Sequence, residues 1–177
     1  MGRYRTNPMK SLVFKFIKEE DFQNKLNIIS EFNFVHFEKW FQIELACYFK
    51  KKKFFNYCPF KWTAEYSHTN KKGKIIPDFT IFYNTSGNEF YTEIKQYDSF
   101  ITCFNKMVDD FYKVKNAVDK KNSENINCIG VFKTEYFSED KLSNLKDGFK
   151  KDKHLITKIE EIKIKEIPNT KYSLMYF

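Results

Sequence analysis

A run of five turn-forming residues, Asn84-Thr85-Ser86-Gly87-Asn88, does most to constrain how this chain can fold. It separates segments 75–83 and 90–97, which are rich in the β-branched and aromatic residues that favour strands. Asn, Ser and Gly are residues that tight turns use, because they adopt turn conformations readily. The two segments are therefore predicted to form an antiparallel hairpin that turns about Ser86-Gly87.

This hairpin is predicted to gather charged side chains on one face. Its register places Asp78 opposite Lys95 and Thr80 opposite Glu93, all projecting to the same side. Directly opposed Cβ atoms lie about 5 Å apart and diagonal ones about 7–8 Å apart, so the two carboxylates can converge on one hard cation beside the lysine. Mg²⁺ prefers oxygen ligands, and a bound ion can polarise a phosphoryl oxygen and activate a water. The pattern indicates a site suited to phosphodiester hydrolysis.

The segment 36–52 is predicted to be a helix with an inward carboxylate. Its apolar residues recur at spacings of three and four, and Glu44 falls within their stripe, whereas Glu38 and Lys39 lie nearer the outer side. A buried carboxylate is costly unless it is paired, so Glu44 either serves a site or forms a salt bridge with a lysine. The stripe consists of Phe37, Trp40, Phe41, Leu45, Tyr48 and Phe49.

The remaining segments complete an α/β pattern in one domain, 1–177. The order from about residue 35 to 132 is α-β-β-β-α-β, which predicts a mixed central sheet flanked by helices. Residues 1–34 form an N-terminal extension, and 133–177 add a helix and strands. The predicted strands are 11–18, 61–67, 125–132, 162–167 and 172–177, the helices are 19–29, 100–120 and 139–154, and residues 68–74 are predicted to be a turn.

The residues Pro77-Asp78, a gap of 14 residues and then Glu93-Ile94-Lys95 resemble the PD-(D/E)xK nuclease superfamily, which has the restriction-endonuclease-like fold. The resemblance implies that Asp78, Glu93 and the Ile94 carbonyl bind Mg²⁺, with Mn²⁺ as a substitute. It also implies that Lys95 positions or activates the attacking water. Many members carry an acidic residue on the first helix, and Glu44 matches that position as a further ligand or water contact.

Other polar residues lie near this motif in the sequence. Gln96 either contacts phosphate or metal-bound water or bonds only to backbone, and the backbone interpretation is slightly favoured. Lys106 is a candidate to face the same cleft. Asp110 and Lys113 are spaced as an i,i+3 surface pair on the helix that follows.

The net charge of +8 is concentrated ahead of the motif. Such a cluster suits a phosphate backbone, although a charge run is often only a solvated face. The proposed contacts with nucleic acid are Lys50, Lys51, Lys52, Lys53, Lys71, Lys72 and Lys74. Arg3 and Arg5 are the sole arginines, which disfavours recognition of guanine by arginine.

These features favour a Mg²⁺-dependent DNA endonuclease that acts as a homodimer. The alternatives are an RNA-directed or structure-specific nuclease, such as a toxin that cleaves transfer RNA or a junction resolvase, and a non-catalytic nucleic-acid-binding module. No apolar run is long enough to span a membrane, and no signal peptide is visible, so the expected location is cytoplasmic. The four cysteines are expected to be free, buried thiols, because their spacing matches no zinc motif.

Overall fold

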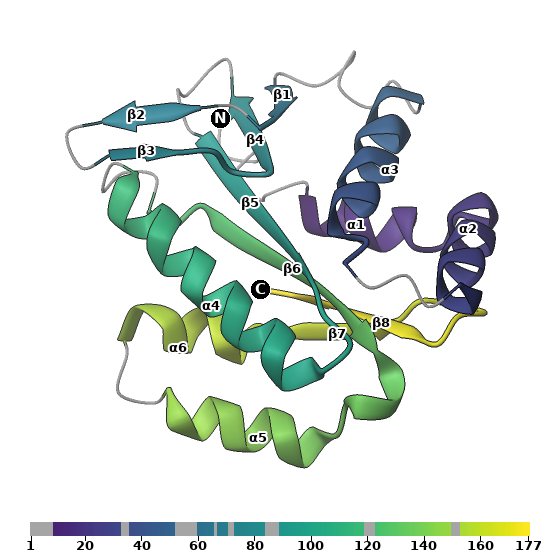
Figure 1. Ribbon diagram of the computed structural model, residues 1–177. Coiled ribbons are helices and arrows are strands. Elements are labelled where there is room, and N and C mark those ends of the chain that lie inside the picture. Colours follow the sequence, from purple (N-terminus) through teal and green to yellow (C-terminus); the bar gives the residue numbers. More distant parts are fainter. Residues whose placement is uncertain are drawn as a thin grey trace.

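The structure is a computed structural model of the chain. It describes residues 9–32, 36–51, 60–65, 67–70, 73–83, 89–118, 123–149 and 153–177. A mixed six-stranded sheet lies between two groups of helices, one on each face (Figure 1). This arrangement confirms the predicted α/β class. None of the helices in the described segments is both long and apolar enough to cross a membrane.

Strand order in the main sheet is β1-β4-β5-β6-β8-β7. Pairing is antiparallel throughout except between β5 and β6, which are parallel and joined by a helical crossover. The strands are β1 (Phe60–Ala64), β4 (Phe79–Tyr83), β5 (Glu89–Gln96), β6 (Ile126–Lys133), β7 (Lys163–Glu166) and β8 (Tyr172–Tyr176). A single-turn 3₁₀ helix (Thr134–Tyr136) follows β6.

One face of the sheet is covered by α1 (Met9–Phe16), α2 (Glu20–Glu31) and α3 (Glu38–Lys51). The helix α1 corrects the prediction of a strand at 11–18. Its buried residues Met9, Leu12, Val13 and Phe16 follow the i, i+3, i+4, i+7 spacing of a helix. The alternation in the sequence was a weaker signal than this spacing.

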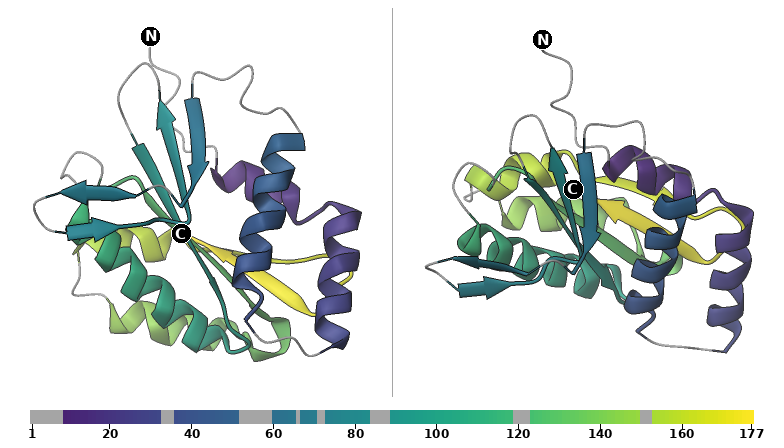
Figure 2. Two further views of the ribbon diagram at one scale, coloured as in Figure 1. Left: turned by 45° about the horizontal axis from the view of Figure 1, so that its top comes forward. Right: turned by 90° about the horizontal axis from the view of Figure 1, so that it is seen from above.

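The opposite face is covered by α4 (Phe100–Ala117), α5 (Glu139–Gly148) and α6 (Lys153–Glu160). The two shorter helices replace the single helix predicted at 139–154. Figure 2 shows both helix groups packed against the same sheet. In this layer Cys103 and Cys128 are buried free thiols as expected, whereas Cys47 on α3 is an exposed thiol.

Residues 68–74, predicted to be a turn, contain a second, two-stranded sheet instead. Its strands are β2 (His68–Asn70) and β3 (Gly73–Ile75), and they pair antiparallel. This ribbon projects from the main sheet beside α4 (Figures 1 and 2). Residues 71 and 72, between the two strands, lie outside the described residues.

The hairpin of β4 and β5 forms as predicted, in a register that differs by two residues. Phe79 pairs with Thr92 and Thr80 pairs with Tyr91, whereas Thr80 was expected opposite Glu93. Side chains alternate with period two, so a shift of two residues leaves each one on its original face. The buried pattern therefore could not distinguish these registers. Continued outward, the observed register places Asp78 beside Glu93.

Candidate active site

The strands β4 and β5 separate at Asp78. Their ladder ends at the Phe79–Thr92 pair, while β5 continues to Gln96. Beyond this point a side-chain hydrogen bond takes the place of the backbone ladder. The Asp78 Oδ2 accepts a hydrogen bond of 2.6 Å from the Ile94 N–H. The Tyr97 N–H, by contrast, bonds to β6. A residue's N–H and C=O point to the same side of a strand, so the Ile94 carbonyl also faces this open edge beside Asp78.

Glu93 lies next to Asp78 on the face that α4 covers. It is only 9% exposed, and among the described residues no hydrogen bond or ion pair reaches its carboxylate. Burial, together with the charges of Asp78 and Asp110, raises the pKa of Glu93 to about 9. Burial also raises the pKa of Asp78, to about 6, although the Ile94 N–H and the Lys95 charge oppose the rise. Two adjacent, poorly solvated carboxyl groups therefore lie at the open edge.

Lys95 extends from the same face of β5 as Glu93. Its Nζ lies 3.2 Å from Glu38 Oε1 and 2.9 Å from Asp110 Oδ2, and the side chain is 17% exposed. Because β4 no longer covers this edge, Glu38 from α3 and Asp110 from α4 reach the lysine from opposite layers. Burial alone lowers the pKa of Lys95, but the two carboxylates outweigh it and raise the pKa, so the ammonium stays charged.

Asp110 was predicted to form a surface pair with Lys113. The structure contains this pair and a second one, between Asp110 and Lys95. The pair forms, at 2.6 Å, through Oδ1, but the Asp110 side chain is 14% exposed and its other oxygen faces Lys95. Burial raises the pKa of Asp110, yet hydrogen bonds from Lys113 and Lys95 lower it overall. The available signal was the spacing of seven from buried Cys103 and three from buried Met107, which places Asp110 beside the inner face of the helix.

The structure does not bring Glu44 to this group. Glu44 forms an ion pair with Lys25 of α2 at 3.1 Å, so the alternative prediction, a salt bridge with a lysine, is confirmed. Glu38, which was expected on the outer side, is the α3 carboxylate at the site. Six residues rotate a helix by about 240°, so Glu38 and Glu44 lie roughly 120° apart around α3. The missed signal was the spacing of three, four and seven from Glu38 to buried Phe41, Gln42 and Leu45.

Gln96 and Lys106 lie at the margins of the group. The buried Gln96 side chain accepts a hydrogen bond of 3.2 Å from the Phe37 N–H, so it bonds to backbone and holds the start of α3 against β5. It thereby places Glu38, the next residue, near Lys95. Lys106 is half exposed on α4 and pairs with Asp109 at 3.5 Å, with no contact to Lys95 or Glu93 among the described residues.

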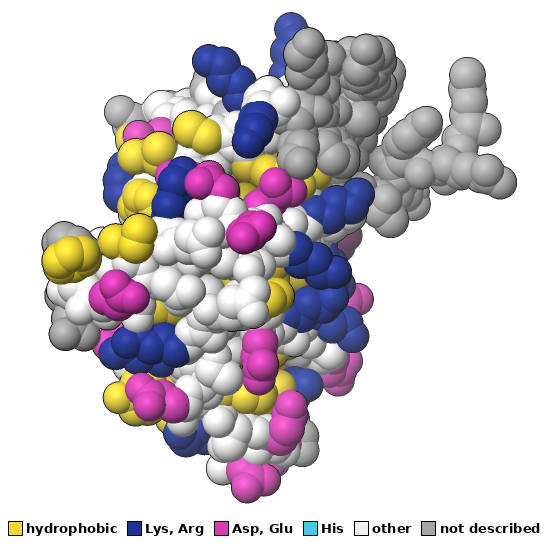
Figure 3. Space-filling view, turned by 90° about the vertical axis from the view of Figure 1, so that its right-hand side faces the viewer, with side chains coloured by type: hydrophobic (Ala, Val, Ile, Leu, Met, Phe, Trp, Pro, Cys, Tyr) yellow, Lys and Arg dark blue, Asp and Glu magenta, His cyan; other side chains and the backbone are white. Residues whose placement is uncertain are grey.

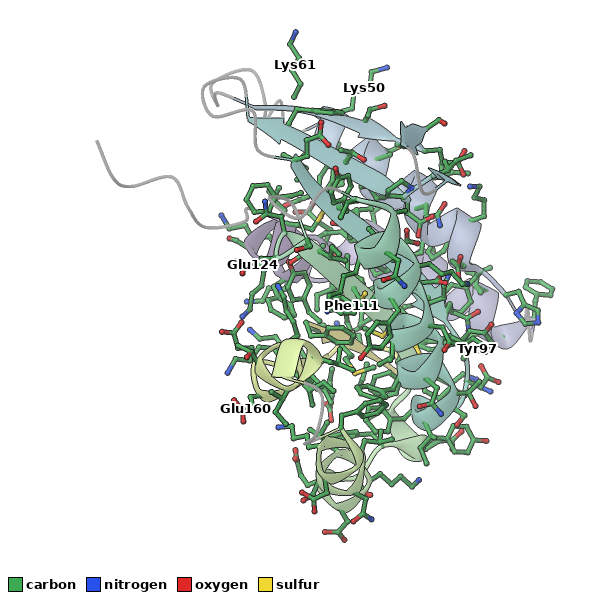
Figure 4. The ribbon with its side chains drawn as sticks, turned by 90° about the vertical axis from the view of Figure 1, so that its left-hand side faces the viewer. Lys50, Lys61, Tyr97, Phe111, Glu124 and Glu160 are labelled. Carbon is green, nitrogen blue, oxygen red and sulfur yellow. The ribbon has the colours of Figure 1, made fainter. Side chains whose placement is uncertain are left out.

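The lysines proposed to contact nucleic acid lie partly outside the described residues. Lys52, Lys53, Lys71 and Lys72 are not described, and only the backbone of Lys74 is. Lys50 and Lys51 are exposed at the end of α3 opposite to Glu38. Lys50 extends from the same end of the molecule as Lys61 (Figure 4). A rise of 1.5 Å per residue puts Lys50 about 18 Å along the helix from Glu38.

Elsewhere on the surface, charges of both signs are mixed. Figure 3 shows a face that carries both lysines and Asp or Glu side chains, with several of the lysines grouped toward one side. Lys25 pairs with Asp21 and Glu44, and Lys39 pairs with Glu65. These two lysines are therefore paired with nearby carboxylates.

The donors at the open edge fit a hard cation better than a soft one. Two carboxylates and a backbone carbonyl are oxygen ligands of the kind that Mg²⁺ takes, with waters in its other positions. Glu93 in particular is a buried carboxylate that lacks a cationic partner within ion-pair distance in the described structure. In that part of the chain, no three His, Cys, Asp or Glu side chains converge as a ready-made metal site. Lys95 lies between Glu38 and Asp110.

The arrangement as a whole places two carboxyl groups, the Ile94 backbone carbonyl and a charged lysine at one break in a sheet. Such a group can hold a divalent cation and orient a water beside it. A comparison of the chain with protein-family models, with curated proteins and with solved structures found no match.

Proposed function

We propose that this protein is a metal-dependent nuclease that hydrolyses phosphodiester bonds in nucleic acid, and that DNA is its substrate. The observation that carries the proposal is the pair of neighbouring carboxyl groups, Asp78 and Glu93, at the point where β4 and β5 separate. Burial raises the pKa of both groups, the Asp78 charge raises that of Glu93 further, and a divalent cation is the partner that would stabilise both carboxylates. The proposal is also supported by the order of the main-sheet strands and their helices, α3-β1-β4-β5-α4-β6, in which the separate ribbon β2-β3 is inserted between β1 and β4.

In this proposal Asp78, Glu93 and the Ile94 carbonyl hold Mg²⁺, for which Mn²⁺ can substitute, and Glu38 takes the role expected of Glu44. The ion, when bound, polarises the phosphoryl group and lowers the pKa of a water. Lys95 hydrogen-bonds the attacking water or the phosphate and offsets negative charge that develops there. The water oxygen bonds to phosphorus, the bond to the leaving sugar oxygen breaks, and that oxygen takes up a proton.

A module that only binds nucleic acid is less well supported by the same residues. The carboxylates of Asp78, Glu38 and Asp110 would repel a phosphate backbone in the absence of a cation. Binding without metal would therefore have to rely on lysines elsewhere. Cleavage of RNA or of branched DNA uses the same chemistry, so the substrate has to be separated by experiment.

The test is cleavage of supercoiled plasmid, a four-way junction and a structured RNA with Mg²⁺, Mn²⁺ or chelator. Asp78→Asn keeps an oxygen that can accept from the Ile94 N–H, and Glu93→Gln keeps the size of the side chain. Both variants are expected to lose at least about 10³-fold in activity, since each removes a metal ligand. Glu44→Gln, which breaks only the contact with Lys25, is the matched control and should stay active.

Metal-dependent cleavage of plasmid that both variants abolish would support a DNA nuclease. Preferential cleavage of RNA or of the junction would support metal-dependent phosphodiester hydrolysis but contradict unbranched duplex DNA as the substrate. A wild-type protein that cleaves nothing under any of these conditions, or an Asp78→Asn variant as active as the wild type, would contradict the proposal.

A further inference from the structure

We propose that Asp110 is a positioning residue that fixes the direction of the Lys95 ammonium from the α4 side of the site. This inference rests on the proposed nuclease function and adds a residue that the sequence motif does not contain. Asp110 lies 15 residues beyond Lys95 in the chain, and α4 brings it to 2.9 Å from Lys95 Nζ.

The first step of the argument is the geometry of the lysine. An ammonium carries three N–H donors. Glu38 and Asp110 accept two of them in the described structure, from the α3 side and from the α4 side. The two carboxylates therefore hold the charged end of a flexible side chain from opposite layers, and the third N–H remains for water or phosphate.

The second step is that the two carboxylates are not equivalent. Glu38 is 30% exposed and belongs to the group that would face a bound cation, so its contact with Lys95 competes with that role. Asp110 is 14% exposed and is held through its other oxygen by Lys113. Asp110 is thus the partner that can keep Lys95 in place when Glu38 turns toward a cation.

The third step is the close packing that supports Asp110. One turn before it, Met107 packs over Gly130 of β6, where an added Cβ would lie 2.4 Å from the Met107 sulfur. The Cys103 thiol donates to the backbone carbonyls of Lys95 and Val131 at 3.7 Å each. These contacts hold α4 against β5 and β6, so Asp110 is presented by a rigid element.

The experiment compares Asp110→Asn with Asp109→Asn on the substrate that the wild type cleaves best. Asp109 is the neighbouring carboxylate, 56% exposed and paired only with Lys106 in the described structure, so it is a matched control. Asp110→Asn is expected to lower kcat about 10- to 100-fold, the usual effect of removing a supporting contact, with little change in KM. Asp109→Asn should keep the wild-type values, and Asp110→Glu, which retains the charge, should recover part of the loss.

A second readout does not depend on cleavage. In ¹H–¹⁵N spectra, an ammonium held by two carboxylates exchanges slowly enough to give a signal, and Lys95→Met identifies which signal is that of Lys95. We expect that signal in the wild type and in Asp109→Asn, and its loss in Asp110→Asn. Melting temperatures of all variants report whether each is folded.

The outcomes separate this inference from the proposed function. A wild type that cleaves, with an Asp110→Asn variant of normal kcat and an unchanged Lys95 signal, overturns the role of Asp110 alone. A lower melting temperature with unchanged kcat also overturns it, since the contact would then be structural. A wild type that cleaves nothing overturns both. If Asp110→Asn does not fold, an Asp110→Glu variant with no recoverable activity counts against the inference.

Discussion

Two lysines in this protein have nearly the same immediate partners and very different surroundings. Lys25 Nζ lies 3.0 Å from Asp21 and 3.1 Å from Glu44, and Lys95 Nζ lies 2.9 Å from Asp110 and 3.2 Å from Glu38. Each lysine thus contacts two carboxylates, one of them on α3. The side chain of Lys25 is 41% exposed, however, whereas that of Lys95 is 17% exposed.

The surroundings of the two lysines differ in how well their charges are screened by solvent or paired. Around Lys25, solvent screens the charges, and such a group contributes at most about 1 kcal/mol to stability. Around Lys95 lie two further carboxyl groups, the half-buried Asp78 and the buried Glu93, and neither forms an ion pair with a lysine among the described residues. A purely structural group has no reason to retain this excess of acid, because paired charges or apolar residues would be more stable. The comparison therefore points to Lys95 and its neighbours as the functional group.

Replacing the two lysines by methionine should give the largest difference. Lys95→Met removes the donor to water or phosphate and is expected to lower kcat about 10³-fold, within the range for a group that acts on the reacting proton or charge. Lys25→Met should leave kcat within about twofold and lower the free energy of unfolding by at most about 1 kcal/mol. Steady-state cleavage and urea unfolding measure the two effects. Equal activities of the two variants would remove the distinction drawn here.

Replacing the two glutamates of α3, Glu38 and Glu44, should also affect kcat unequally, but by less than replacing the two lysines. Glu38→Gln removes a contact with Lys95 and is expected to reduce kcat about 10- to 100-fold, as the loss of an outer contact to a metal site does. Glu44→Gln should retain wild-type kcat, because its partner Lys25 lies outside the site. Initial rates over a range of Mg²⁺ concentrations test this prediction. A larger loss in Glu44→Gln than in Glu38→Gln would restore the assignment made from the sequence.

That assignment shows what the sequence could and could not predict. The hairpin and its motif were predictable, because turn residues and strand composition are local signals. The choice between Glu38 and Glu44 was not, because it depends on how α3 is rotated about its axis against the sheet. Aromatic residues from Phe37 to Phe49 form a wide stripe, and its centre is defined only by the packing of Phe41 and Leu45. Asp110 was missed for the same reason, since its partner Lys95 is brought to it by the crossover of α4.

The pH dependence of stability should differ between the wild type and a variant that lacks the Glu93 carboxyl group. Burial and nearby carboxylates raise the pKa of Glu93 to about 9, so the folded state keeps a proton that the unfolded state has lost. The contribution of Glu93 to the stability of the metal-free protein is therefore fully present below the unfolded pKa of Glu and is lost as the pH rises toward 9, by up to about 1.4 kcal/mol per pH unit. Glu93→Gln has no carboxyl group that titrates at this position. Its free energy of unfolding, measured with urea in the presence of chelator, should therefore fall less steeply between pH 5.5 and 8.5. Parallel curves for the two proteins would show that Glu93 ionises normally.

The smallest effect is expected at Lys113, which shares a carboxylate with Lys95 but not its surroundings. Its Nζ lies 2.6 Å from Asp110 Oδ1, which is shorter than either ion-pair distance of Lys95, yet the side chain is 71% exposed. Solvent and salt screen an exposed pair, so a short distance adds little free energy. Lys113→Gln should therefore change the free energy of unfolding by no more than about 0.5 kcal/mol and kcat by less than about twofold. Raising the salt concentration should reduce even that difference, whereas a loss comparable to that of Lys95→Met would mean that distance, and not burial, decides which lysine matters.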